Sequence, residues 1–282
     1  MRLILMTCMT MIAFASNSVL TRWAVDGGHI DPNSFAVIRV LAGAVVLCTI
    51  VVLRQGKLPL WRKSRIAGVI SLSAYMVGFS LAYLTLDAGL GALILFGVVQ
   101  MTMFFHGIRT GVGPSGRQIS GAGLAFVGLL LALWPGPGGA ADLVGASFMV
   151  AAGVGWGIYS IVGRGGADPL ASTAANFLLC LPLMAVLLVG VQPNFGITGV
   201  VLAVLCGGLT SGLGYAMWYT VLPRLSNSTA AIVQLSVPIL AIFAGALILN
   251  ENIAALTIIA AALVLGGIML AITSRSAPAD RS

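Results

Sequence analysis

The sequence predicts an all-α membrane protein of ten transmembrane helices, arranged as two inverted five-helix repeats. Composition is the first observation: hydrophobic residues make up 59% of the 282 residues and charged residues 7%, with a mean hydropathy of +1.08. Such a chain is suited to lipid rather than to water. The second observation is a series of apolar stretches of bilayer-spanning length, and the third is a set of motifs that occur twice.

Ten apolar stretches approach the ~20 residues that a helix needs to cross a bilayer. Helices are the expected structure, because hydrocarbon offers no water to backbone polar groups and the alternation of a barrel strand is absent. The expected spans are 3–25, 32–53, 66–86, 89–107, 115–134, 143–162, 169–191, 197–222, 226–249 and 253–273.

The repeated motifs lie at a nearly constant distance. Asp31-Pro32 recurs as Asp168-Pro169, 137 positions later, and Gly78-Phe79 recurs as Gly214-Tyr215, 136 positions later. This period matches one whole bundle of five helices. We therefore expect a duplicated bundle.

Five spans are an odd number, so the second copy must enter the membrane from the opposite face. We expect residues 1–135 to form the first repeat and residues 136–282 the second, together making one transport domain. The stretch Pro135-Gly136-Pro137-Gly138-Gly139 suits the linker. Inverted repeats are typical of transporters that work by alternating access.

The net charge of +7 follows the expected topology. With the N-terminus in the cytoplasm, Arg22 falls outside, Arg39 lies within the membrane, and the other 12 of the 14 basic residues fall on the cytoplasmic side. The positive-inside rule then places both termini in the cytoplasm of a multi-pass protein of the bacterial inner membrane. The lipid bilayer is the expected partner, with anionic-lipid binding by the basic cluster as the lesser alternative and no nucleic acid. The twelve basic residues expected on the cytoplasmic side are Arg2, Arg54, Lys57, Arg62, Lys63, Arg65, Arg109, Arg117, Arg164, Arg224, Arg275 and Arg281.

The first span has a competing interpretation as a secretory signal, because Ala13-Phe14-Ala15 resembles a cleavage site. Cleavage would remove a helix that the second copy possesses and would leave nine spans. We therefore expect the first span to be retained.

Motifs of enzymes are missing. The sequence has no nucleotide-binding Gly-Lys-Ser signature, no pair of acids within a span and no helical His-Glu-x-x-His metal site. Cys8, Cys48, Cys180 and Cys206 lack the spacing of metal ligands. We expect no enzymatic activity, no cofactor and no metal, with an intramembrane enzyme as the alternative from another class.

Polar and aromatic residues within the spans are the candidate substrate contacts. Tyr75, Phe79 and Tyr83 follow at intervals of four on one helix face, and the second copy answers with Ser211, Tyr215 and Tyr219, beside Trp218. Such rings and hydroxyls suit a cavity for amphipathic molecules; interfacial belts or packing are the alternative. The further candidates are Ser16, Asn17, Gln100, Tyr159 and Gln234.

Arg39 is the costly residue, since a central Arg is unfavourable by about 2.5–3.5 kcal/mol on insertion scales. Asp26, Asp31 or helix carbonyls could pair with it. We favour a gating or structural role for Arg39 and for Pro238 over binding of a substrate carboxylate.

Several of these motifs resemble the EamA-type exporters of the drug/metabolite transporter superfamily. The matches are Phe14-Ala15-Ser16-Asn17, Trp156-Gly157-Ile158-Tyr159, Arg39, Ser236-Val237-Pro238 and Asn250-Glu251. They cover essentially the whole chain and look most like the amino-acid exporters of the YddG type. The first copy departs from the pattern, having Gln100 and Arg109-Thr110-Gly111 where the family carries Pro and Gly-Glu.

The resemblance implies export of amino acids, preferably aromatic or hydrophobic ones, or of related small metabolites, by alternating access. A sugar or nucleotide-sugar carrier is the alternative within transport. The substrate is a small molecule, and the sequence is compatible with a monomer. Because all seven acids lie at helix ends or in loops, we expect facilitation down the substrate gradient rather than obligatory proton coupling.

Overall fold

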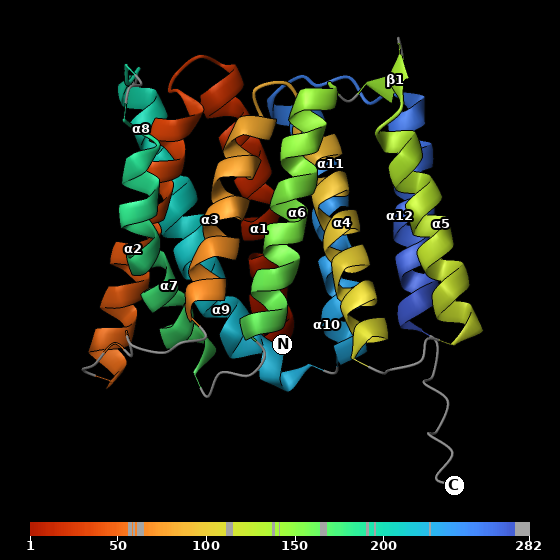
Figure 1. Ribbon diagram of the computed structural model, residues 1–282, viewed down its shortest axis with the longest axis horizontal. Coiled ribbons are helices and arrows are strands. Elements are labelled where there is room, and N and C mark those ends of the chain that lie inside the picture. The colour runs from red at the N-terminus through yellow and green to blue at the C-terminus, as the bar shows by residue number, and fades with distance from the viewer. Residues whose placement is uncertain are drawn as a thin grey trace, which may run out of the picture.

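The computed structural model describes residues 1–55, 58, 60, 65–110, 115–136, 139–140, 142–163, 168–189, 192–194, 196–225 and 227–273. Its helices run from one face of the bundle to the other (Figure 1). Helix α1 begins and α12 ends on the same face, here called the terminal face, and the β1 strand lies on the opposite face. An even number of crossings explains that arrangement.

The first repeat contains five helices: α1 (Arg2–Asp26), α2 (Pro32–Gln55), α3 (Arg65–Ala82), α4 (Ala88–Arg109) and α5 (Gly116–Ala132). Helix α5 begins at a capping box, in which Ser115 and Gln118 each accept the other's backbone N–H. A pair of two-residue antiparallel strands follows, β1 (Pro135–Gly136) and β2 (Gly139–Ala140). Residues 137–138 of the expected linker lie outside the described residues, as does much of the basic cluster at 54–65.

The second repeat contains the same five crossings with two interruptions. Helices α6 (Leu143–Gly163), α7 (Pro169–Val186) and α12 (Ala255–Ile272) are continuous. The eighth crossing comprises α8 (Ile197–Val204), the π-helical η1 (Leu205–Leu213), α9 (Gly214–Val221) and the short η2 (Leu222–Arg224). The ninth crossing is split into α10 (Asn227–Gln234) and α11 (Ser236–Ile248).

The break in the ninth crossing has a local cause. Pro238 has no N–H, so the carbonyl of Gln234 cannot receive its usual helical hydrogen bond. Leu235 instead donates its N–H to Ile232 at 3.0 Å, and the Ser236 hydroxyl donates to Val233 at 2.6 Å. The sequence predicts one helix here, and the proline divides it.

Eight helices among the described residues are long and apolar enough to span a bilayer, and the shorter apolar segments Gly116–Ala132 and Ile232–Ile248 complete the expected ten. Equivalent helices of the two repeats pack together: α5 against α12, α2 against α7 and α4 against α11. Figure 1 shows α5 beside α12 at one edge of the bundle and α2 beside α8 at the other. The fold is thus the expected ten-helix bundle of two inverted repeats.

Candidate functional site

Aromatic rings of both repeats meet in the interior of the bundle. Trp156 of α6 lies at their centre, with its ring centroid 4.9 Å from that of Tyr75 and 5.3 Å from that of Tyr215, which it stacks at 25°. Phe14 packs edge-on against Tyr215 at 5.7 Å, and Phe79 lies 5.3 Å from Tyr75. Both repeats contribute rings, so the cluster lies across the interface at which inverted-repeat transporters bind their substrates.

A small cavity of about 20 Å³ lies against these rings. That volume holds about one water molecule. The interior is therefore closed around a nearly filled site, and a larger ligand requires the helices to separate. The lining residues are Phe14, Asn17, Ser18, Tyr75, Phe79, Leu95, Phe96, Trp156, Tyr215 and Gln234.

Arg39 lies directly behind the aromatic wall and is fully buried. Its Nη2 donates to Tyr75 Oη at 3.1 Å and to Asn17 Oδ1 at 3.2 Å, and its Nε donates to Ser211 Oγ at 3.3 Å. The guanidinium carbon lies 4.7 Å from the centroid of the Phe79 ring, within the range of a cation–π contact.

Asn17 organises the polar side of the site. Its Oδ1 also accepts hydrogen bonds from Thr210 at 2.7 Å and from Ser211 at 3.0 Å, both in η1. The approach of η1 to α2 depends on Gly207, where a Cβ would overlap the carbonyl oxygen of Arg39. The glycine-rich π-helical segment thus brings the Ser211 hydroxyl to the arginine.

Some of the residues predicted from the sequence are brought together here. Asn17, Tyr75, Phe79, Tyr215 and Gln234 line the cavity, and Ser211 lies one contact behind it. Gln234 ends α10 directly before the break that precedes Pro238. These residues belong to α1, α3, η1, α9 and α10, so both copies supply the site.

Other predicted residues lie elsewhere. Ser16 donates its hydroxyl to Ile12 of its own helix at 2.8 Å, and Gln100 does not line the cavity. Trp218 packs edge-on against Phe14 behind the cavity wall. Tyr83 follows the end of α3, is fully buried, and donates to the Ala88 carbonyl at 3.3 Å, so it is neither an interfacial belt residue nor a cavity residue.

Tyr159 stacks on Trp156, with the ring centroids 5.5 Å apart, while its hydroxyl belongs to a chain of hydroxyl groups outside the cavity lining. Its hydroxyl donates to Thr173 at 2.9 Å, and Thr173 donates to Tyr219 at 3.0 Å. This chain ties α6 to α7 and α9. A hollow of about 140 Å³ lined by Arg54, Asp168 and Tyr219, among others, lies beside it, where α2 ends and α7 begins.

Three rings that line the cavity, those of Phe14, Phe96 and Trp156, are not among the contacts predicted from the sequence. Phe14 and Trp156 belong to corresponding motifs of the two repeats. Ser18 and Leu95 also line the cavity. Large rings near the middle of spans α1 and α6 were the available signal.

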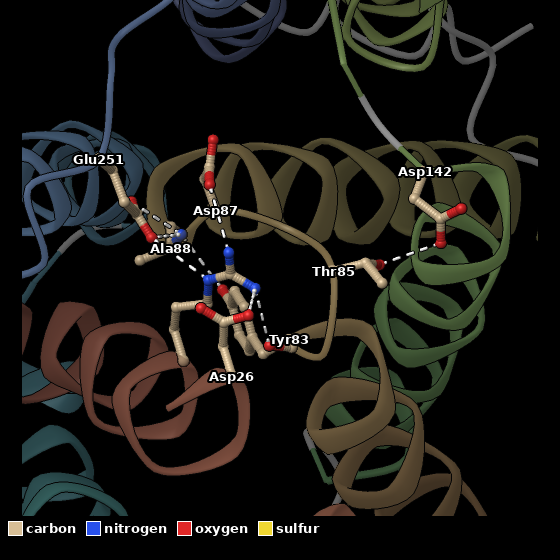
Figure 2. A network of polar contacts seen from close by, with 8 residues as sticks. Asp26, Tyr83, Thr85, Asp87, Ala88, Asp142 and Glu251 are labelled. Carbon is tan, nitrogen blue, oxygen red and sulfur yellow. Dashed lines mark hydrogen bonds and ion pairs between the residues drawn. The ribbon is translucent and has the colours of Figure 1, made fainter. Parts of the chain in front are cut away.

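The face opposite the terminal face carries a network of charges around Arg22. Figure 2 shows its three carboxylates, those of Asp26, Asp87 and Glu251. The Arg22 guanidinium lies 3.1 Å from Asp26, 3.6 Å from Asp87 and 3.6 Å from Glu251. The network bounds a hollow of about 410 Å³. Because Ser18 precedes Arg22 by one helical turn in α1, the network lies directly above the central cavity.

Glu251 links the two repeats within this network. Both of its carboxylate oxygens accept the Ala88 N–H, at 2.8 and 3.0 Å, and so cap the first turn of α4 in place of the adjacent Asp87, which makes no side-chain cap (Figure 2). Burial raises the pKa of Glu251 above 4.5, with Asp87 acting in the same direction and the Ala88 N–H and Arg22 opposing it. Burial also raises the pKa of Asp87.

The expected acidic partners of Arg39 are engaged elsewhere. Asp26 pairs with Arg22. Asp31 accepts the backbone N–H groups of Ser34 and Asn194, at 2.9 and 3.1 Å. Burial alone would raise the pKa of Asp31, but hydrogen bonds from Ser34, Asn194 and Asn33 hold it below its ordinary value.

Comparison with known proteins agrees with this architecture. A model of the EamA-like transporter family matches residues 1–134 and 143–273. An uncharacterized protein of Pseudomonas aeruginosa is 43% identical over 286 residues, covering 99% of this chain and 98% of the relative. An uncharacterized transporter of Clostridium kluyveri is 24% identical over 263 residues, covering 87% of this chain and 85% of the relative.

A solved crystal structure with 18% sequence identity superposes with a TM-score of 0.68, covering 95% of this chain and 98% of that chain. This likeness concerns the fold alone. The family match, which covers almost the entire chain in two segments, assigns the molecule: it is a membrane transporter that belongs to the EamA-like transporter family.

Proposed function

We propose that the protein exports amino acids, with a preference for aromatic or hydrophobic side chains, or closely related small metabolites, across the bacterial inner membrane. The main support for this proposal is the aromatic cluster around Trp156, which adjoins the polar groups of Asn17 and Gln234. Rings offer area to an apolar side chain, while amide groups can orient its polar end. Among the described residues that line the cavity none is cationic, which disfavours the phosphate groups of a nucleotide sugar.

Alternating access is the proposed mechanism, with the terminal face in the cytoplasm. On the opposite face, the Arg22–Glu251 network joins α1 and the start of α4 to the loop before α12. On the terminal face, the Tyr159–Thr173–Tyr219 chain joins α6, α7 and α9. We propose that these two sets of contacts are the outer and inner gates. The cavity between them would then be the ligand-free site.

Counterflow into proteoliposomes tests the substrate class. Purified protein is reconstituted with one unlabelled amino acid, sugar or nucleotide sugar inside, and uptake of the same labelled compound is compared with protein-free liposomes. We expect saturable exchange for aromatic and large apolar amino acids. Folded protein that exchanges a sugar or nucleotide sugar but no amino acid would overturn the proposal.

A further inference from the structure

Arg39 holds a buried positive charge that nothing in the described chain neutralises. Every side chain to which it donates is neutral, and the ion pairs found among the described residues all belong to Arg22. Its Nη1 has no hydrogen-bond partner among those residues, although the atom is buried. A charged group held away from water without a counter-ion is strongly unfavourable.

The position of this charge relates it to the central cavity. Tyr75, Asn17 and Phe79 contact the guanidinium and also line the cavity. A single layer of side chains therefore separates Arg39 from the proposed substrate. Movement of the Tyr75 ring would expose a donor that its hydroxyl now occupies.

The chemistry of a guanidinium selects the counter-ion. Its planar donors match the two oxygens of a carboxylate, and such charge-assisted pairs are among the strongest hydrogen bonds in proteins. One cation balances one carboxylate, whereas a phosphate monoester carries nearly two negative charges at neutral pH. Among the described residues, no second cationic side chain lines the cavity or contacts Arg39.

We propose that Arg39 binds the carboxylate of the transported molecule, so that the substrate itself supplies the missing counter-ion. The sequence alone favours a gating or structural role, and the neutral partners and the unpaired Nη1 of Arg39 in the structure are the reason for this change. This inference rests on the proposed function of the central cavity. The apolar part of the substrate then lies against Trp156 and Tyr215. An ammonium group meets only neutral groups in this lining, such as the Gln234 amide, the Ser18 hydroxyl and the ring faces, so the carboxylate is the group that the buried charge requires.

A matched series of ligands with one side chain tests the proposal. Phenylalanine, phenylalanine amide, phenethylamine and 3-phenylpropionate differ only in which charged groups they carry. Each is used to compete with labelled phenylalanine in counterflow by the full-length protein. We expect the amide and the amine to compete about 10- to 100-fold more weakly than phenylalanine, the range of a lost charge-assisted hydrogen bond. The carboxylate without an amine should remain within about tenfold.

Variants at Arg39 separate recognition from structure. Arg39→Gln should remove the discrimination between acid and amide, whereas Arg39→Lys should retain part of it. If Arg39→Gln does not fold, Tyr75→Phe serves instead: it frees a guanidinium donor, so the acid should compete at least as well as before and the amide should not gain.

The possible failures are distinct. Equal competition by acid and amide in the unmodified protein would overturn the role of Arg39 and leave amino-acid export standing. An unchanged ratio of acid to amide in folded Arg39→Gln would do the same. Phenylalanine counterflow that is absent, together with exchange of a sugar, would instead overturn the proposed function.

Discussion

Replacement of Arg22 by Gln should open the face opposite the termini. Arg22 is the common partner of three carboxylates, and its side chain is 14% exposed. Without it, Glu251 and Asp87 would face each other with no cation between them. Conformations that expose these carboxylates to water should then become more populated.

The size of the effect can be worked from the distances. At 3.6 Å from Glu251, an effective dielectric constant of about 20 gives a gross attraction of about 4.6 kcal/mol. Asp26 and Asp87 are 48% and 49% exposed, so water reduces their shares to about 1 kcal/mol or less each. The substitution also removes the desolvation penalty of Arg22, which offsets part of this attraction. We therefore expect the free energy of gate opening to fall by about 1–3 kcal/mol, which raises the ratio of open to closed gate about 5- to 150-fold.

The assay uses a reporter cysteine inside the cavity. Ser18→Cys is introduced into a version lacking the four native cysteines, and a membrane-impermeant thiol reagent is added outside intact cells. Labelling should be about 5- to 150-fold faster with Arg22→Gln, and nearly unchanged with Arg22→Lys.

A double substitution gives the sharper test. Adding Glu251→Gln to Arg22→Gln should return labelling close to its original rate, because the neutral amide still accepts the Ala88 N–H but carries no unpaired charge. Labelling of folded Arg22→Gln within twofold of the original, or additive effects of the two substitutions, would refute the reasoning.

Three further results are expected. Acid should favour the closed gate, because the raised pKa of Glu251 means that the closed state binds the proton more tightly than the open state. The extra stability of the closed state is complete below pH 4.5 and is lost as the pH rises through the raised pKa. Labelling of Ser18→Cys, normalised to that of exposed Asn252→Cys, should therefore fall in acid, and should fall less with Glu251→Gln. Trp156→Ala should weaken substrate binding about 5- to 150-fold in a competition assay, whereas Trp218→Ala, outside the cavity lining, should change it less than threefold. Pro238→Ala restores a helical hydrogen bond and should slow turnover about two- to tenfold; an unchanged rate would leave Pro238 with a purely structural role.

The sequence predicted those features that depend on local periodicity. The interval of four residues places Tyr75 and Phe79 on one helix face, and both line the cavity. Tyr83 continues the same spacing and packs edge-on against Phe79 at 4.8 Å, but its hydroxyl turns to the Ala88 carbonyl and it does not line the cavity. The membrane-spanning helices are equally predictable, because the length of an apolar stretch can be read directly from the sequence.

Long-range contacts were beyond such patterns. The sequence places Glu251 in a loop, where the structure has it, but its carboxylate caps a helix whose first residue is 163 positions away. Its carboxylate is therefore mostly buried at the start of α4, a position that depends on this long-range contact. The central position of Trp156 likewise depends on the packing of α6 against Tyr75 of α3 and Tyr215 of α9, which local patterns do not predict.

The π-helical segment has a consequence for how the two halves tolerate deletions. Gly214 donates its N–H to Leu209, five residues back, rather than four. Removing one residue, such as lipid-exposed Leu209, can therefore let this segment adopt regular α-helical pairing while α8 and α9 keep their phase. The same deletion in α3 would turn everything beyond it by about 100° and carry Tyr75 out of its place. The eighth crossing can thus lose one residue without rotating the helix beyond it, whereas the equivalent helix α3 of the first repeat cannot.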